Sequence, residues 1–250
     1  MPKTRRHGTF PFFALGRRQL KERSDMRRKM ENMKPRYKAV LFDFDGTLAD
    51  TSEGIFKSLQ YAFEADGKPS HPLSTLRKFI GPPIYDSFQT LFGYPDDKIG
   101  FMIEKYRERY RARGWREARV YDGIPQLLRT LRESGVKTAT ASSKPTPYIE
   151  QILREQGLIQ YVDYVGGASF DEKSADKAEI MRTAMRMLGV ASADTVMVGD
   201  RLYDICGAKA AGIPCIAVLY GFGSRAEFEE YGADHIAETP ADVQKLIFED

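Results

Sequence analysis

Residues 40–48 read Val-Leu-Phe-Asp-Phe-Asp-Gly-Thr-Leu, an apolar run that ends in two carboxylates, Asp43 and Asp45, followed by Gly46. In an extended strand, side chains two positions apart point to the same face, so both acids are expected to gather where the strand ends. Unpaired carboxylates beside apolar residues are costly unless a metal ion, a hydrogen bond or water compensates them. On their own, the two aspartates are equally consistent with a solvated strand end at which Gly46 makes the turn.

A second acidic cluster of the same construction lies far along the chain. Residues 195–204 read Thr-Val-Met-Val-Gly-Asp-Arg-Leu-Tyr-Asp, so Asp200 ends an apolar run and Asp204 follows four residues later. If a helix begins after Asp200, Asp204 lies in its first turn, near the strand end. Four carboxylates at one edge of a parallel sheet predict a hard oxygen site that suits Mg²⁺ better than zinc. The cysteines and histidines are scattered and offer no competing ligand set.

Hydroxyl groups end a third strand-like run, and a lysine opens a helical pattern. Within residues 136–145, the strand-like run ends in Ser142 and Ser143. The turn after these serines would expose backbone N–H groups that suit a phosphate. Lys177 stands at the start of a helical pattern, where the helix dipole favours anions over cations. Taken alone, Lys177 reads as an ordinary surface lysine, but a site rich in aspartate and phosphate would give it a partner.

These segments carry a family resemblance. Four of them resemble the ordered motifs of the haloacid dehalogenase-like hydrolase superfamily: Asp43 to Leu48, Ser142 to Lys144, Lys177, and Gly199 to Asp204. Three further segments resemble its phosphoglycolate phosphatase-like branch, which carries a helical cap: residues 81–83, 121–124 and 220–223. The resemblance covers about residues 37–248. One departure is that many relatives carry Thr and Asn where this chain has Ser142 and Ser143.

The resemblance implies a role for each motif residue. Asp43 would be the nucleophile that forms an aspartyl-phosphate, and Asp45 would be the general acid toward the leaving group and then the general base toward water. Lys177 would offset the clustered negative charge as the third catalytic residue. Mg²⁺ would be held by the Asp43 carboxylate, the Asp45 main-chain carbonyl and Asp200.

The remaining roles concern the phosphate and the support of the site. The resemblance assigns phosphate binding to Ser142, Ser143 and Thr47. Asp204 would orient Lys177 or a water of the metal site without touching the metal itself. The second aspartate, Asp45, favours phosphate chemistry over dehalogenation in this superfamily.

The alternation of patterns predicts an α/β fold with a doubly wound parallel sheet, a Rossmann-like core. Strand-like runs occur at about 38–43, 136–141, 161–165, 194–199 and 214–218. Helical patterns occur between and after them at about 123–134, 145–156, 177–188, 203–211 and 240–248. Asp176 and Glu179 have the spacing of a capping box. All the motif residues fall at the carboxyl ends of strands, where such folds bind ligands.

The stretch between the first two core segments reads as helices only. We therefore expect an inserted all-helical cap at residues 52–119 and a catalytic core formed by residues 37–51 and 120–250. Tyr106 and Tyr110, four residues apart on a helix, are expected to pack in the cap's own small core. The segment Ile80 to Pro83 reads either as a stiff turn that faces the substrate or as an ordinary connection between helices.

The charge of the chain is unevenly distributed. Residues 1–36 hold 12 Lys or Arg against 3 Asp or Glu, a local charge of +9, whereas the remainder holds 26 against 32, a charge of −6. The basic segment shows no periodicity with a packable face and is typical of a disordered extension. No export signal or membrane span is recognisable and the two cysteines are unpaired, so we expect a cytoplasmic protein with no membrane partner.

The leading functional hypothesis is a Mg²⁺-dependent phosphomonoester hydrolase for a small phosphorylated metabolite, with phosphoglycolate or a 5′-nucleotide as the nearest family precedents. A phosphosugar mutase is the first alternative, because an aspartyl-phosphate can return its phosphoryl group to a substrate. An inorganic pyrophosphatase is a second one. A nucleic-acid binder is not expected, because the basic residues are confined to one terminal segment and no base-reading motif accompanies them. The sequence indicates neither the leaving group nor the oligomeric state.

Overall fold

The computed structural model describes residues 34–170 and 176–248, and residues 35–250 form one compact unit. Nearly all of the basic segment predicted at residues 1–36 lies outside the described residues. Arg36 belongs to the folded unit, because its backbone N–H donates to the carbonyl of Ile247 at 2.9 Å.

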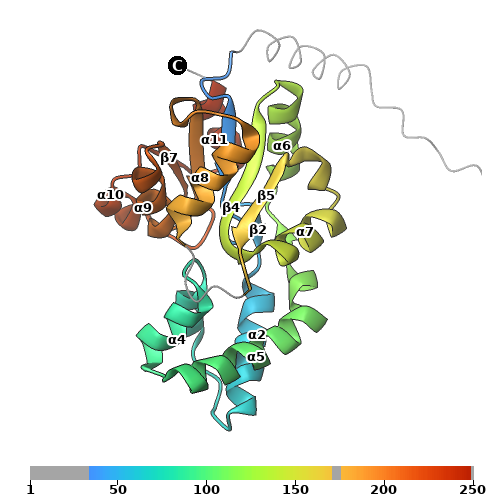
Figure 1. Cartoon of the computed structure of the whole chain (residues 1–250), viewed down its shortest axis with the longest axis vertical. Coiled ribbons are helices and arrows are strands. Elements are labelled where there is room, and N and C mark those ends of the chain that lie inside the picture. The colour runs from blue at the N-terminus through green and yellow to red at the C-terminus, as the bar shows by residue number, and fades with distance from the viewer. Residues whose placement is uncertain (1–33, 171–175, 249–250) are drawn as a thin grey trace, which may run out of the picture. The chain divides into compact units, whose positions relative to one another are not determined.

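A six-stranded sheet forms the core of this unit, in the order β5-β4-β1-β6-β7-β8 (Figure 1). Every adjacent pair is parallel. The strands are β1 (Ala39–Phe42), β4 (Lys137–Pro145), β5 (Tyr164–Ala168), β6 (Thr195–Gly199), β7 (Cys215–Val218) and β8 (His235–Ala237). The central strand β1 is buried throughout, as expected for a parallel sheet covered on both faces. The α/β fold class predicted from the sequence is confirmed.

Helices connect these strands and flank the sheet. They are α6 (Ile124–Glu133), α7 (Thr146–Glu155), α8 (Lys177–Leu188), α9 (Leu202–Ala211), α10 (Arg225–Tyr231) and α11 (Pro240–Phe248). Alternate side chains of β1 face opposite sides of the sheet. Leu41 accordingly joins a buried cluster with Met181 of α8 and Ile205 of α9. This packing fixes the starts of α8 and α9 beside the carboxyl ends of the strands.

A helical segment follows the first strand and is inserted between two short strands, β2 (Ala49–Asp50) and β3 (Arg119–Val120), which pair antiparallel. Its helices are α2 (Ser52–Ala65), α3 (Leu73–Leu76), α4 (Ile84–Phe92) and α5 (Asp96–Ala112), with 3₁₀ turns at Arg77–Phe79 and Gly114–Glu117. Buried Leu59, Phe63 and Phe88 form a hydrophobic cluster of their own. In Figure 1, α2, α4 and α5 lie together at one end of the unit, away from the sheet.

Three details differ from the sequence expectations. Strand β5 begins at Tyr164 and not at 161, because Ile159–Tyr161 form a 3₁₀ turn. The short elements α10 and β8 had no predicted counterpart, since a seven-residue helix and a three-residue strand show too little periodicity. The capping box of α8 is half formed: Asp176 accepts from the backbone N–H groups of Ala178 and Glu179, but the Glu179 carboxylate pairs with Arg186.

Within the described residues, no helix is long and apolar enough to span a membrane.

Candidate active site

Three carboxylates meet at the carboxyl edge of the sheet. Asp43 follows β1 and Asp200 follows β6, and these two strands are hydrogen-bonded neighbours. Asp204 lies in the first turn of α9. The three side chains are buried, and an oxygen of each lies within 4.8 Å of the others. The structure therefore brings together one acid of the first motif and two acids of the second cluster, although Asp43 and Asp200 are 157 residues apart in the sequence.

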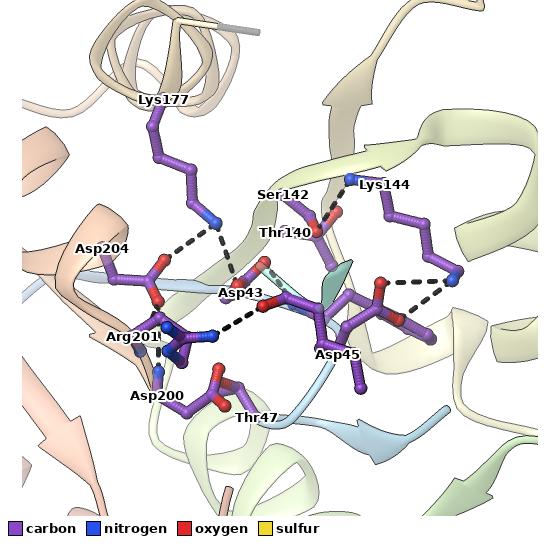
Figure 2. Close-up of polar contacts among 12 residues, drawn as sticks. Asp43, Asp45, Thr47, Thr140, Ser142, Lys144, Lys177, Asp200, Arg201 and Asp204 are labelled. Atoms are coloured by element: carbon purple, nitrogen blue, oxygen red, sulfur yellow. Dashed lines mark hydrogen bonds and ion pairs between the residues drawn. The ribbon is translucent and has the colours of Figure 1, made fainter. Parts of the chain in front are cut away.

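Lys177 is the cation of this cluster. Its Nζ lies 2.9 Å from Asp43 Oδ2 and 2.8 Å from Asp204 Oδ1, as Figure 2 shows. Burial alone would lower the pKa of Lys177, but the Asp204 and Asp43 carboxylates outweigh burial and raise it. The unfavourable position of a lysine at a helix start is thus balanced by two buried ion pairs.

Backbone N–H groups hold the acids in place. The N–H of Phe44 donates to Asp43 Oδ1 at 2.7 Å, and the N–H of Phe222 donates to Asp200 Oδ2 at 2.8 Å. Asp204 Oδ2 accepts from the N–H groups of Asp200 and Arg201. Burial and the neighbouring Asp204 and Asp43 carboxylates raise the pKa of Asp200 well above its usual value. Burial and Asp43 raise the pKa of Asp204 to about 6.

Two glycines allow the backbone to approach Asp200 this closely. Gly46 has a φ of +86°, and a Cβ there would stand 2.0 Å from Asp200 Oδ2. A Cβ at Gly221 would stand 2.4 Å from the Asp200 Cβ and from the carbonyl oxygen of Gly46. Larger residues at either position would displace the Asp200 carboxylate.

The donor set fits a hard divalent cation. Three buried carboxylates face one lysine, so with all three ionised the cluster keeps a net negative charge that burial makes costly. Carboxylate oxygens are the ligands that Mg²⁺ prefers. Asp43 and Asp200 are among the predicted ligands, and Asp204 adds a third carboxylate within reach of both.

The hydroxyl residues lie around the acids. Ser142 ends the regular part of β4, and its Oγ accepts from the N–H of Lys144 at 3.2 Å. Ser142 and Ser143 line the same cavity as Asp43. The Thr47 hydroxyl is fully buried and donates to Asp200 Oδ1 at 3.4 Å. The phosphate-binding role of these three residues stays a prediction, and the contact of Thr47 indicates support of Asp200.

The pairing of Lys144 with Asp45 was not predicted from the sequence. The lysine Nζ lies 2.9 Å and 3.2 Å from the two carboxylate oxygens of Asp45 (Figure 2). Asp45 also accepts from the Thr51 hydroxyl at 2.6 Å. The lysine side chain is 3% exposed and its Nζ stands 4.7 Å from the ring centroid of Tyr110. Lys144 was part of the quoted motif, but its partner could not be inferred from sequence spacing.

A cavity of about 640 Å³ opens onto this site. At one end it contains Asp43, Asp45 and Ser142. At the other it is lined by residues of the helical segment between β2 and β3, including Tyr106 and the predicted turn residues 81–83. Tyr106 and Tyr110 stack on each other, as expected for packing within that segment, and they also line the cavity.

Two arginines tie the helical segment to the sheet domain. Arg201 donates through Nη1 to the carbonyl of Ile80 at 2.7 Å and through Nε to Glu227 at 3.0 Å. Arg107 of α5 donates to the carbonyl of Phe170 at 2.7 Å. Arg201 thus reaches from the sheet domain to the helical segment, and Arg107 reaches in the reverse direction. Each of these two bonds ends on a backbone carbonyl, that of Ile80 or Phe170.

Comparison with known proteins places this site in a family. A 5′-nucleotidase of Pseudomonas aeruginosa is 35% identical over 212 residues, which are 85% of this chain and 96% of the relative. The tyrosine-protein kinase PtkA of Mycobacterium tuberculosis is 35% identical over 83% of this chain and 70% of its own length. The crystal structure of a predicted phosphatase from Clostridium acetobutylicum superposes with a TM-score of 0.81 at 40% identity, covering 84% of this chain and 98% of that one.

The family model for haloacid dehalogenase-like hydrolases matches residues 40–218, a range that begins in β1 and ends with β7. It therefore contains the strand ends that carry Asp43, Ser142 and Asp200, together with Lys177. Because the match spans most of the chain and includes all of these positions, the protein belongs to the haloacid dehalogenase-like hydrolase family.

Proposed function

We propose that this protein is a Mg²⁺-dependent phosphomonoester hydrolase that acts through an aspartyl-phosphate on Asp43, with residues 52–119 as its cap. The observation that carries the proposal is the placement of a buried, hydrogen-bonded Asp43 carboxylate beside Lys177 and two further acids at the end of a ligand-sized cavity. The family membership and the names of two relatives, a 5′-nucleotidase and a predicted phosphatase, support the reaction class.

The reaction has two displacement steps. In the first, the Asp43 carboxylate attacks phosphorus, the bond from phosphorus to the leaving oxygen breaks, and Asp45 gives its proton to that oxygen. In the second, Asp45 takes a proton from water as the water oxygen attacks the phosphoryl group. The Asp43–phosphorus bond then breaks, which yields inorganic phosphate and restores the carboxylate.

The other residues supply charge and orientation. Lys177 lies within ion-pair distance of the nucleophile and offsets negative charge as the phosphate approaches. The Ser142 hydroxyl and the backbone after it are positioned at the same cavity to bind phosphoryl oxygens. Asp43, Asp200 and the Asp45 carbonyl would hold Mg²⁺, whose chemistry is to neutralise the phosphate oxygens.

The test is phosphate release over a panel of phosphoesters, with Mg²⁺ and with chelator. Rapid acid quench with ³²P-labelled substrate should leave label on the wild-type chain and none on Asp43→Asn. Since one relative is named as a kinase, label should also be sought on added alcohols. Transfer to an alcohol in place of phosphate release would favour a transferase or mutase and contradict hydrolysis.

Removal of Mg²⁺ should affect both activity and stability. Chelation is expected to abolish turnover, and adding Mg²⁺ at about 100 times its dissociation constant should stabilise the fold by about 2.7 kcal/mol. Thermal unfolding with and without Mg²⁺ measures the shift. The shift should vanish in Asp200→Asn and persist in Asp194→Asn, since Asp194 precedes β6 at the opposite edge of the sheet. A shift that is equal in both variants would place the ion elsewhere.

We further propose that Lys144 positions Asp45 for proton transfer. Lys144→Met removes the cation that binds both Asp45 oxygens. The first chemical step should therefore slow by about 10-fold or more, which is part of the rate acceleration that a positioned acid or base supplies. The measurement is single-turnover formation of the phosphoenzyme with a poor alkyl leaving group and with a good aryl one. The loss should be larger for the poor leaving group.

A double-mutant cycle provides the control. If Lys144 acts through Asp45, the effects of Lys144→Met and Asp45→Asn on this step should be clearly non-additive. Lys57→Met, which removes an exposed lysine paired with Glu53 on α2, should leave the rate unchanged. Equal losses for both leaving groups, or additive effects, would argue against the positioning role.

A further inference from the structure

The ammonium group of Lys144 is deeply buried and has one charged partner. The lysine side chain is 3% exposed, and among the described residues its Nζ donates only to the two carboxylate oxygens of Asp45. An ammonium group carries three N–H donors, and burying it is costly unless its surroundings replace the water that it loses. One carboxylate accounts for part of this compensation, so the rest comes from other groups around the Nζ.

An aromatic ring lies against this ammonium group. The Nζ of Lys144 stands 4.7 Å from the ring centroid of Tyr110, well within the distance at which a ring face attracts a cation. The ring of Phe44 stands farther away, at 6.0 Å, which is about the limit of that range. Tyr110 is 1% exposed, so its contact with Lys144 is shielded from water. A desolvated cation–π contact is stronger than one at the surface.

The neighbours of Tyr110 hold its ring in one place. Tyr106 stacks on it with ring centroids 5.4 Å apart, and Tyr148 meets it edge-on with centroids 4.9 Å apart. Gly114 leaves room for the ring, because a Cβ there would stand 2.6 Å from the Tyr110 Cδ2. Since the ring is fixed by three neighbours, it limits where the ammonium group of Lys144 can lie.

The hydroxyl group of Tyr110 takes no part in this arrangement. It is buried and has no hydrogen-bond partner among the described residues. Phenylalanine would therefore offer Lys144 an aromatic face in the same place without a buried, unpaired hydroxyl. The part of Tyr110 that serves the lysine is the face of its ring.

The contact joins the helical segment to the sheet domain beside the proposed general acid. Tyr110 belongs to α5 of the helical segment, whereas Lys144 belongs to β4. Asp45 also accepts from the hydroxyl of Thr51, the residue directly before α2. Both side chains that bind the Asp45 carboxylate are therefore connected to the helical segment, Thr51 through the chain and Lys144 through the ring of Tyr110.

We propose that Tyr110 is a positioning residue for proton transfer. Its ring holds Lys144 by a cation–π contact, and through Lys144 it fixes the orientation of the Asp45 carboxylate. The proposal rests on the proposed function, in which Asp45 protonates the leaving group, and it goes further by assigning part of that geometry to the helical segment. A ring that only filled space would serve equally well with less electron density on its face, and this difference can be measured.

Fluorinated phenylalanines at position 110 separate a cation–π contact from packing. Each fluorine withdraws electron density from the ring face and weakens its attraction for a cation, while the ring keeps nearly the same shape. Tyr110→Phe should form the phosphoenzyme at close to the wild-type rate in a single turnover. With a poor alkyl leaving group, mono-, di- and trifluorophenylalanine should slow this step progressively, by about 3- to 10-fold for the last. With a good aryl leaving group the loss should be smaller.

Phe88 provides the matched control. It is a fully buried phenylalanine of α4 in the same helical segment, outside the cavity lining, and no cation of the described residues lies over its ring. The same fluorinated series at position 88 should leave the rate unchanged. Equal rates across the series at position 110, or losses of equal size with both leaving groups, would overturn the positioning role.

A double-mutant cycle on stability tests the contact itself, without substrate. Tyr110→Leu and Lys144→Met should have non-additive effects on the free energy of unfolding, because either change alone already removes the cation–π contact. If Tyr110→Leu does not fold, the trifluorophenylalanine variant takes its place in the cycle. Additive effects would show that the ring and the lysine do not interact, and they would overturn the proposal.

Failure of the hydrolase and failure of the positioning role give different results. If the wild type releases no phosphate from any phosphoester while the cycle shows coupling, the hydrolase is refuted together with the role in proton transfer, and the contact between Tyr110 and Lys144 is structural. If phosphate is released at rates that do not respond to fluorination at position 110, the hydrolase stands and only the role of Tyr110 is refuted.

Discussion

Asp43→Asn is expected to reduce turnover by about 10⁴-fold or more, as loss of a nucleophile does in enzymes that form a covalent intermediate. The amide has nearly the shape of the carboxylate and can still accept from the N–H of Phe44, but it cannot displace an alkoxide from phosphorus. The measurement is the steady-state rate of phosphate release together with acid-quench labelling of the chain. Mass spectrometry of the variant must exclude deamidation, which would restore the aspartate.

The fold should survive this change. The Asp43 carboxylate contributes to the raised pKa values of Asp200 and Asp204, so neutralising it removes repulsion within the acidic cluster as well as an ion pair with Lys177. We expect the thermal midpoint to shift by only a few degrees. Asp194→Asn makes the same chemical change at the opposite edge of the sheet and should retain full activity. Turnover of the intact Asp43→Asn protein close to the wild-type rate would refute the mechanism.

Lys177→Met is expected to have the largest effect on stability. It leaves Asp43 and Asp204 buried without their cation, and breaking a buried pair in this way costs about 3–5 kcal/mol. Turnover should also fall by about 10²- to 10³-fold, because the site loses a preorganised positive charge beside the reacting phosphate. Denaturant unfolding in the absence of Mg²⁺, and kcat at saturating Mg²⁺, measure the two losses.

The control for this variant is Lys38→Met. Lys38 also pairs with an aspartate, Asp194, at 2.9 Å, but its side chain is 74% exposed, so the pair contributes at most about 1 kcal/mol. Mg²⁺ should recover part of the stability lost in Lys177→Met, since a cation bound by Asp43 and Asp200 again offsets the cluster. If Lys177→Met and the wild type have equal free energies of unfolding in the absence of Mg²⁺, the lysine does not neutralise these acids.

The sequence was most informative where a residue type conflicts with its local environment. Asp43 and Asp200 each end an apolar strand, and Lys177 stands at a helix start that disfavours cations. Because parallel strands end at one edge of a sheet, these conflicts predict that the residues meet, and the structure brings them together. The fold class followed from the same alternation of strands and helices.

Contacts between segments that are far apart in the sequence could not be predicted in this way. Lys144 and Asp45 are 99 residues apart, and the pairing depends on how β4 bulges between Ser142 and Pro145. The stacked Tyr106 and Tyr110 were expected to pack inside the cap, which they do, but their second role in lining the cavity depends on how the cap docks. Sequence periodicity describes one helix at a time and contains no information on docking. The predicted cytoplasmic location and the basic segment remain predictions.

The two arginine bonds that join cap and core have a consequence for how this protein can diverge. Arg201 and Arg107 bind the backbone carbonyls of Ile80 and Phe170, so neither bond depends on the side chain at position 80 or 170. Phe170 nevertheless lines the cavity. Mutation can therefore exchange that cavity-lining ring for another side chain and lose only its cation–π contact with Arg107, while the hydrogen bond to the backbone carbonyl remains. Evolution of the cavity wall at position 170 is in this respect uncoupled from the hydrogen bond that joins the helical segment to the sheet domain.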